Sequence, residues 1–167
     1  MSRTLDTTEV AVRAWQELRP DEQLTGLAIR MRIQRLDAIV NEELAAIVSR
    51  FGFAVYGDYQ VVGALRRRRE KLRAGDIAEL LMLTPAGVTG RLDRLERAGY
   101  VSRTASIEDA RRVLVGCTPL GRRRVDAAFA AIREYDEQLL QPLSERESVQ
   151  LSELLRTLLA PHDTADG

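Results

Sequence analysis

The residues best suited to chemistry in this chain of 167 residues are arginines, and they gather in one stretch. Residues 84–124 contain nine arginines and four acidic residues, a local excess of five positive charges, although the whole chain has a formal net charge of zero. A guanidinium group presents a planar fork of donors that matches both phosphate oxygens and the edge of guanine. Because the distribution of charge matters more than its sum, we expect a polyanion as the partner of this stretch.

The residue types that catalysis and metal binding require are scarce. The chain has one cysteine, Cys117, and one histidine, His162. One cysteine forms no internal disulfide, and one histidine assembles neither a catalytic constellation nor a zinc site. An enzyme is therefore the least favoured class, and neither a cofactor nor a metal is expected. Cys117 follows Val115 and Gly116 in a β-prone run, which favours a buried, unreactive thiol over a redox sensor.

The sequence also bears on location. No apolar run approaches the roughly 20 residues that cross a bilayer. Residues 1–15 are polar and acidic where a signal peptide has its apolar stretch. We therefore expect a cytoplasmic protein without a membrane partner, built as one domain with helical extensions.

Apolar spacing and capping signals predict a mainly α-helical fold with one small β-hairpin. Helix starts are marked by a capping residue, in two cases followed by proline, and strands by short β-prone runs. In the helix that follows Thr118, apolar spacing predicts inward-facing Val125, Phe129, Ile132 and Leu139. The predicted elements are an amphipathic helix at 4–18, a long helix at 24–51 with one apolar stripe, a helix capped by Asp58, a short helix at 76–82, a helix at 84–98, strands at 100–104 and 112–117, a helix capped by Thr118 and a helix capped by Ser144.

The middle of this order is a winged helix-turn-helix. The helix at 76–82 suits the bracing position and the helix at 84–98 the reading position, which lies in the major groove. Small residues near the start of the reader helix let the backbone approach base edges, although each internal glycine costs a helix roughly 1 kcal/mol. Arg91 or Arg94 could read guanine or hold phosphate. On this helix alone, a solvated amphipathic helix with surface arginines remains an alternative.

The hairpin that follows favours the DNA-binding interpretation. Asp109 and Arg111 lie at its tip, spaced so that the carboxylate can orient the guanidinium. An arginine on a β-tip is suited to a narrow minor groove. The basic run at 66–71 could contact phosphates as well, or form a solvated turn.

Two segments resemble a known family. Residues 83–101 (LTPAGVTGRLDRLERAGYV) resemble the recognition helix of the MarR (multiple antibiotic resistance regulator) family, and residues 109–121 (DARRVLVGCTPLG) resemble its wing and the start of its fifth helix. The resemblance extends over about residues 24–160. It implies a homodimer that places two winged helices on successive major grooves of double-stranded DNA with a pseudo-palindromic operator. It further implies DNA contacts from Thr84, Ala86, Gly87, Thr89, Gly90, Arg91, Arg94, Asp109, Arg111 and Arg112.

The resemblance also suggests regulation by a ligand. Members of this family commonly release DNA when a small phenolic or anionic molecule binds, and a urate-responsive subgroup carries an added N-terminal helix with a tryptophan. This chain is similar to the subgroup in Trp15, Arg91 and Arg103, but it has Gln60 where the subgroup has aspartate. The resemblance therefore implies a repressor released by a small anionic or aromatic ligand near these four residues, without implying urate. Packing of the added helix against the body is the alternative role for Trp15.

The expected organisation follows from these elements: an extra N-terminal helix at 1–20, a dimerisation region at 21–56 and 119–162, a winged helix-turn-helix at 57–118 and a tail at 163–167. The long helix and the two C-terminal helices offer more apolar surface than a domain of this size covers by itself, so a second copy is expected to bury it. A monomeric helical core is the alternative. A winged helix that binds only proteins is the second function class, which would lack the basic wing and the small-faced reader helix.

Overall fold

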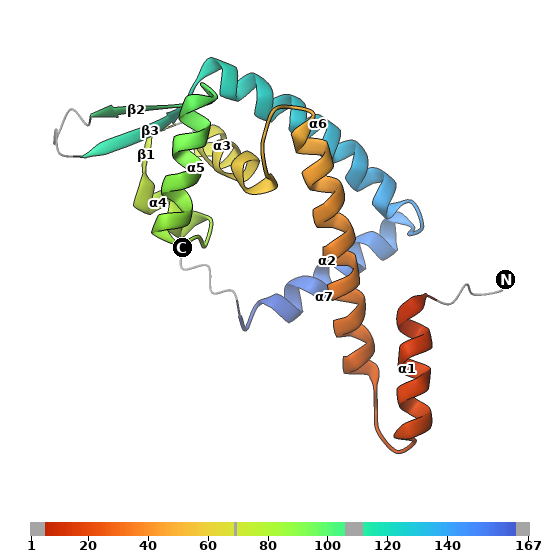
Figure 1. Cartoon of the computed structure of the whole chain (residues 1–167). Coiled ribbons are helices and arrows are strands. Elements are labelled where there is room, and N and C mark those ends of the chain that lie inside the picture. Colours follow the sequence, from red (N-terminus) through yellow and green to blue (C-terminus); the bar gives the residue numbers. More distant parts are fainter. Residues whose placement is uncertain (1–5, 69, 106–111, 163–167) are drawn as a thin grey trace.

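The computed structural model describes residues 6–68, 70–105 and 112–162. It confirms the mainly helical fold with a small antiparallel sheet (Figure 1). The elements are α1 (Thr7–Leu18), α2 (Thr25–Ser49), α3 (Tyr56–Arg68), β1 (Leu72–Arg73), α4 (Ala74–Leu80), α5 (Pro85–Arg97), β2 (Val101–Ala105), β3 (Val113–Cys117), α6 (Pro119–Leu140) and α7 (Glu145–Leu159).

Three predicted capping residues start their helices as expected. The Thr84 hydroxyl accepts from the Gly87 N–H at 3.2 Å and the Thr118 hydroxyl from the Gly121 N–H at 3.0 Å. Ser144 and Glu147 form a reciprocal capping box at the start of α7. These side chains satisfy N–H groups that the first turn of a helix leaves without a backbone partner.

One prediction about local structure is wrong and another, the hairpin, is confirmed but incomplete. Asp58 does not cap α3, because it lies within the first turn of that helix and its side chain is only 2% exposed. The predicted hairpin is part of a three-stranded sheet in the order β1-β3-β2, since the short β1 pairs with β3 through Leu72 and Val115.

The winged-helix part has its own hydrophobic core between α3, α4, α5, the sheet and the adjoining halves of α2 and α6. Val88, Leu92 and Leu95 bury the inner face of α5, as the helical spacing predicts. The buried set also includes Val48, Phe53, Val61, Val62, Leu65, Ile77, Val101, Val115, Val125 and Ala128. The reader helix is thus fixed to a packed body on one side only.

The long helices extend away from this body (Figure 1), and much of their apolar surface stays exposed. On α2 the predicted stripe is buried at Leu44 and Ile47, but not at Ile29, Ile33 and Leu36. The prediction that Phe129 and Leu139 face inward on α6 is wrong for the single chain, where Phe129 is 59% exposed. On α7 no residue is buried by the described part of the chain. These faces lack a covering element.

Helix α1 packs along the half of α2 that is remote from the winged helix (Figure 1). Arg32 of α2 holds the start of α1, with its Nε 3.0 Å from Asp6 Oδ2 and its Nη2 2.9 Å from Glu9 Oε2. The added helix is therefore joined to α2 by charge as well as by packing.

Candidate nucleic-acid interface

The first half of α5 presents a face of small, exposed residues. Ala86, Gly87, Thr89 and Gly90 are all exposed, and Thr84 caps the helix at the same end. At Gly90 no described atom lies within 4 Å of the place that a Cβ would occupy. Packing within the described chain therefore does not require glycine at this position, and the face is open to a partner molecule.

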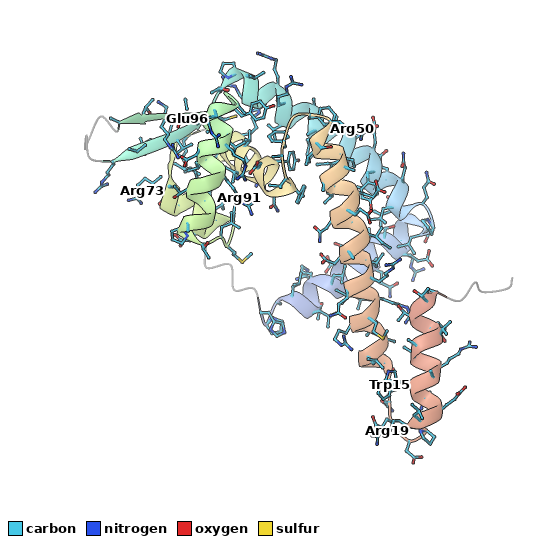
Figure 2. The ribbon with its side chains drawn as sticks, viewed as in Figure 1. Trp15, Arg19, Arg50, Arg73, Arg91 and Glu96 are labelled. Atoms are coloured by element: carbon cyan, nitrogen blue, oxygen red, sulfur yellow. The ribbon has the colours of Figure 1, made fainter. Side chains whose placement is uncertain are left out.

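Arg91 does not share this open face. Its guanidinium lies against the first turn of α3, where a Cβ on Gly57 would overlap it. The side chain is partly buried, and no hydrogen bond or ion pair joins it to another described residue. Glycine at position 57 thus makes room for the Arg91 side chain between α5 and α3 (Figure 2).

Arg94 joins the reader helix to α3. Its Nε lies 3.1 Å from Asp58 Oδ2 and its Nη2 lies 2.8 Å from Asp58 Oδ1, a bidentate pair. The hydrogen bonds to this carboxylate raise the pKa of the Arg94 guanidinium above its usual value. The predicted contact of Arg94 with DNA stays a prediction, but the structure gives this side chain a bracing role that the sequence did not indicate.

Arg103 joins the wing to the reader helix in a similar way. From β2 it reaches Asp93 Oδ1 at 2.7 Å and Glu96 Oε2 at 2.8 Å, and its backbone N–H donates to the other Glu96 oxygen. The bond to Asp93 is the chief reason that the pKa of Arg103 is raised. Its donors are thus bonded to two acidic residues of α5. The predicted role of Arg103 in ligand binding stays a prediction.

The four predicted ligand-binding residues are not gathered at one place in the single chain. Trp15 is half-exposed on α1, on the helical extension, whereas Arg91 lies on α5 in the winged-helix part (Figure 2). Gln60 is exposed on α3, the helix whose first turn Arg91 contacts.

The wing is described only in part. The predicted tip residues Asp109 and Arg111 lie outside the described residues. Arg112 is exposed immediately before β3. On the described strands, Val101 and Arg103 face α5, so the wing and the reader helix form one assembly.

Sequence reasoning missed the acidic partners of these arginines. Asp58 matched a capping signal, and Asp93 and Glu96 resembled a solvated helix face. Their arginine partners lie 36, 10 and 7 residues away in the sequence. The spacing of Arg103 and Glu96 across the turn after α5 is the one local signal that could have shown such a pair.

Cys117 is half-buried at the end of β3, with its Sγ 3.6 Å from the Thr118 carbonyl oxygen. Burial raises the pKa of the thiol. Within the described ranges there is no cluster of side chains that could hold a metal ion, and no helix long and apolar enough to span a membrane.

We expect Cys117 to react with iodoacetamide more slowly at pH 8 than the same thiol in urea-unfolded protein. A raised pKa leaves a smaller fraction as the reactive thiolate at any pH below it, so the rate should rise at higher pH than in the unfolded chain. Mass-spectrometric alkylation rates between pH 6 and 10 measure this. A folded-protein rate that rises at the same pH as that of the unfolded protein, or at a lower pH, would contradict it.

A helix-turn-helix whose second helix shows a small exposed face, followed by a wing braced against that helix, is a winged-helix unit, the arrangement in which a reader helix is presented to the major groove of DNA. Residues 56–112, which run from the start of α3 to the residue before β3, match the sequence model of the MarR family. Over these residues the chain is similar to transcriptional regulators of the MarR family.

The likeness to such regulators extends along most of the chain. The HTH-type transcriptional regulator PecS of Dickeya dadantii is 27% identical over 157 residues, which is 93% of each chain. The structure of Sco5413, a MarR family transcriptional regulator from Streptomyces coelicolor, aligns with a TM-score of 0.74 and 26% identity over 87% of this chain and all of that one. The S. aureus MepR–DNA complex shares the fold, with a TM-score of 0.67 and 23% identity over 78% of this chain and 94% of that one.

Proposed function

We propose that this chain is a sequence-specific repressor that binds a pseudo-palindromic operator as a homodimer in the cytoplasm and leaves it when a small anionic or aromatic ligand binds. The open small-residue face of α5 carries the proposal. Gly90 weakens the helix and fills no packing need in the described chain, and its place on the exposed face of the reader helix suits close approach to DNA.

In this proposal the N-terminal half of α5 lies in the major groove. Thr84 satisfies only one of the free N–H groups, and the others favour a phosphate oxygen. Ala86, Gly87, Thr89 and Gly90 approach the bases, and Arg91 and Arg94 remain candidates for further contacts with DNA. Asp109, Arg111 and Arg112 belong to the minor-groove contact of the wing.

A second copy is proposed to cover the apolar faces of the extension, residues 21–56 and 119–162. Ile29, Ile33, Phe129 and Leu154 are each more than two-fifths exposed in the single chain. Exposed apolar area of this kind on several helices is typical of an interface between copies. A dimer also supplies the second reader helix, about one helical turn of DNA or ~10 bp away.

Ligand release is proposed to act through Arg91. Its partly buried guanidinium, without an ion-pair partner among the described residues, suits an anionic ligand between α5 and α3. Gln60 and Arg103 lie on the elements that adjoin α5 and are candidates for further contacts. Trp15 is retained as a candidate only if the dimer or the ligand-bound state brings α1 to this place.

The proposal is tested by placing larger side chains on α5. We expect Gly90→Glu to lower affinity for an inverted-repeat duplex by about 100-fold or more, since it adds bulk and negative charge that a phosphate backbone repels. Gly90→Ala should weaken binding several-fold while it stabilises the fold by up to about 1 kcal/mol. Fluorescence anisotropy with duplexes from DNA beside the gene gives the affinities, and urea unfolding gives the stability.

Gly26→Ala is the matched control, because Gly26 is an exposed helical glycine on α2 with no described atom within 4 Å of its Cβ position. Its affinity should equal that of the wild type. Wild-type affinity for Gly90→Glu, or the absence of binding by the wild type to all such fragments at low salt, would refute the proposal.

A further inference from the structure

A second basic feature lies away from α5. A cavity of about 310 Å³ opens between the end of α3, the sheet and the start of α6. Three cationic side chains border it, from Arg66, Lys71 and Arg122, together with Ser102 and the Cys117 thiol. Exposed Arg67, Arg68, Arg123 and Arg124 follow on the same two helix ends. The lining thus carries three cations against Glu70, and Asp126 pairs with one of them, Arg66.

The cavity occupies the face of the sheet opposite the reader helix. Ser102 pairs with Gly116 across β2 and β3, and both line the cavity. The next residue of β2, Arg103, points the other way to bond Asp93 and Glu96 on α5. At Ser102 and Gly116 the cavity therefore lies on the face of the sheet away from Asp93 and Glu96, and its lining residues come from elements other than α5.

The three cations are held in place by neighbouring groups. Arg66 forms a forked pair with Asp126 at 3.1–3.3 Å, and Lys71 Nζ donates to Thr104 Oγ1 at 2.9 Å. Arg122 Nη1 reaches the Cys117 carbonyl oxygen at 3.4 Å. The stem of Lys71 lies on Gly116, where a Cβ would come within 3.0 Å of its Cγ. Cations oriented beforehand lose less freedom when an anion binds.

We propose that this cavity binds a phosphate group, at a site separate from the α5 surface. The phosphate belongs either to a small molecule or to the backbone of bound DNA beside the wing. In either case it would bridge α3, the wing strands and α6, and so restrain the wing. Guanidinium and ammonium groups are the side chains that phosphate prefers.

Cys117 provides a reporter, because it is the one cysteine of the chain and lines the cavity. We expect inorganic phosphate to slow iodoacetamide alkylation of Cys117 at least threefold, saturably, relative to chloride at the same pH and ionic strength. The effect should be lost in Arg122→Gln and in Lys71→Gln. It should persist in Arg123→Gln, which removes the same charge from an exposed position one residue along α6. The ratio of rates with and without phosphate is compared, so that changes in intrinsic thiol reactivity cancel.

A second arm identifies the source of the phosphate. If operator duplex without free phosphate also protects Cys117, and Arg122→Gln removes that protection, the site takes the DNA backbone. If only free phosphate protects, the site takes a small molecule. No protection by either probe, or equal protection in Arg122→Gln, Lys71→Gln and the wild type, overturns the proposal. The free-phosphate arm does not depend on operator binding, so its outcome is separate from that of the proposed function.

Discussion

Replacing Leu154 with glutamate is expected to convert the protein into a monomer and to lower its operator affinity by about 100-fold or more. Leu154 lies on α7, where the described chain buries no residue, and its side chain is 56% exposed. A two-fold axis introduces the substitution twice into one interface, so that two carboxylates would enter an apolar contact. A monomer then keeps one reader helix and loses the advantage of binding two half-sites at once.

Light scattering after size-exclusion chromatography gives the mass of the particle, and anisotropy gives the affinity. Arg156→Gln is the control, since it makes the same change in net charge on the opposite side of α7, where Arg156 is exposed and pairs with Glu153. It should remain dimeric with unchanged affinity. A Leu154→Glu protein of dimeric mass would refute the assignment of α7 to the interface.

The second large effect concerns stability. Arg94→Ala should lower the free energy of unfolding by about 3 kcal/mol, because it leaves the Asp58 carboxylate buried without its bidentate partner. Arg97→Ala serves as the control. Arg97 is exposed on the same helix, and its one described hydrogen bond goes to the Asp93 carbonyl oxygen. That variant should change stability by less than about 1 kcal/mol.

Chemical denaturation of both variants, and of Asp58→Ala with and without Arg94→Ala, forms a double-mutant cycle. The double variant should lose clearly less than the sum of the single losses, and additive losses would show that the pair contributes nothing. Operator variants then separate the two roles of Arg94. A brace lowers affinity for all sequences alike, whereas a base contact relaxes preference at one position.

The sequence predicted those features that depend only on residues close together in the chain. Thr84 and Thr118, each followed by proline, and Ser144 with Glu147 identify helix starts within four residues, and the structure confirms all three. It could not show β1, because Leu72 becomes a strand residue only by pairing with Val115. Asp58 has the same difficulty: a capping carboxylate and a buried one look alike until Arg94, a distant residue, is placed beside it.

The sequence predicted which residues could form the site, but only in part where their side chains lie. The open face of α5 follows from the helical period, because short side chains cannot turn elsewhere. Arg91, Arg94 and Arg103 are long enough to reach neighbouring elements, so the period fixed their Cα positions but not the direction of their guanidinium groups. Phe129 was predicted to face inward because it belongs to the apolar face of α6, but the single chain does not cover that residue.

The two braces have a consequence for how a ligand could act. Arg103 fastens β2 to α5, and Arg94 fastens α5 to α3, so we expect these three elements, here called the reading head, to move together. A ligand that leaves these ion pairs intact can alter the distance between the two reading heads of a dimer, but not the shape of either head. Such a protein would still grip an isolated half-site with undiminished strength, and would lose only its ability to span both.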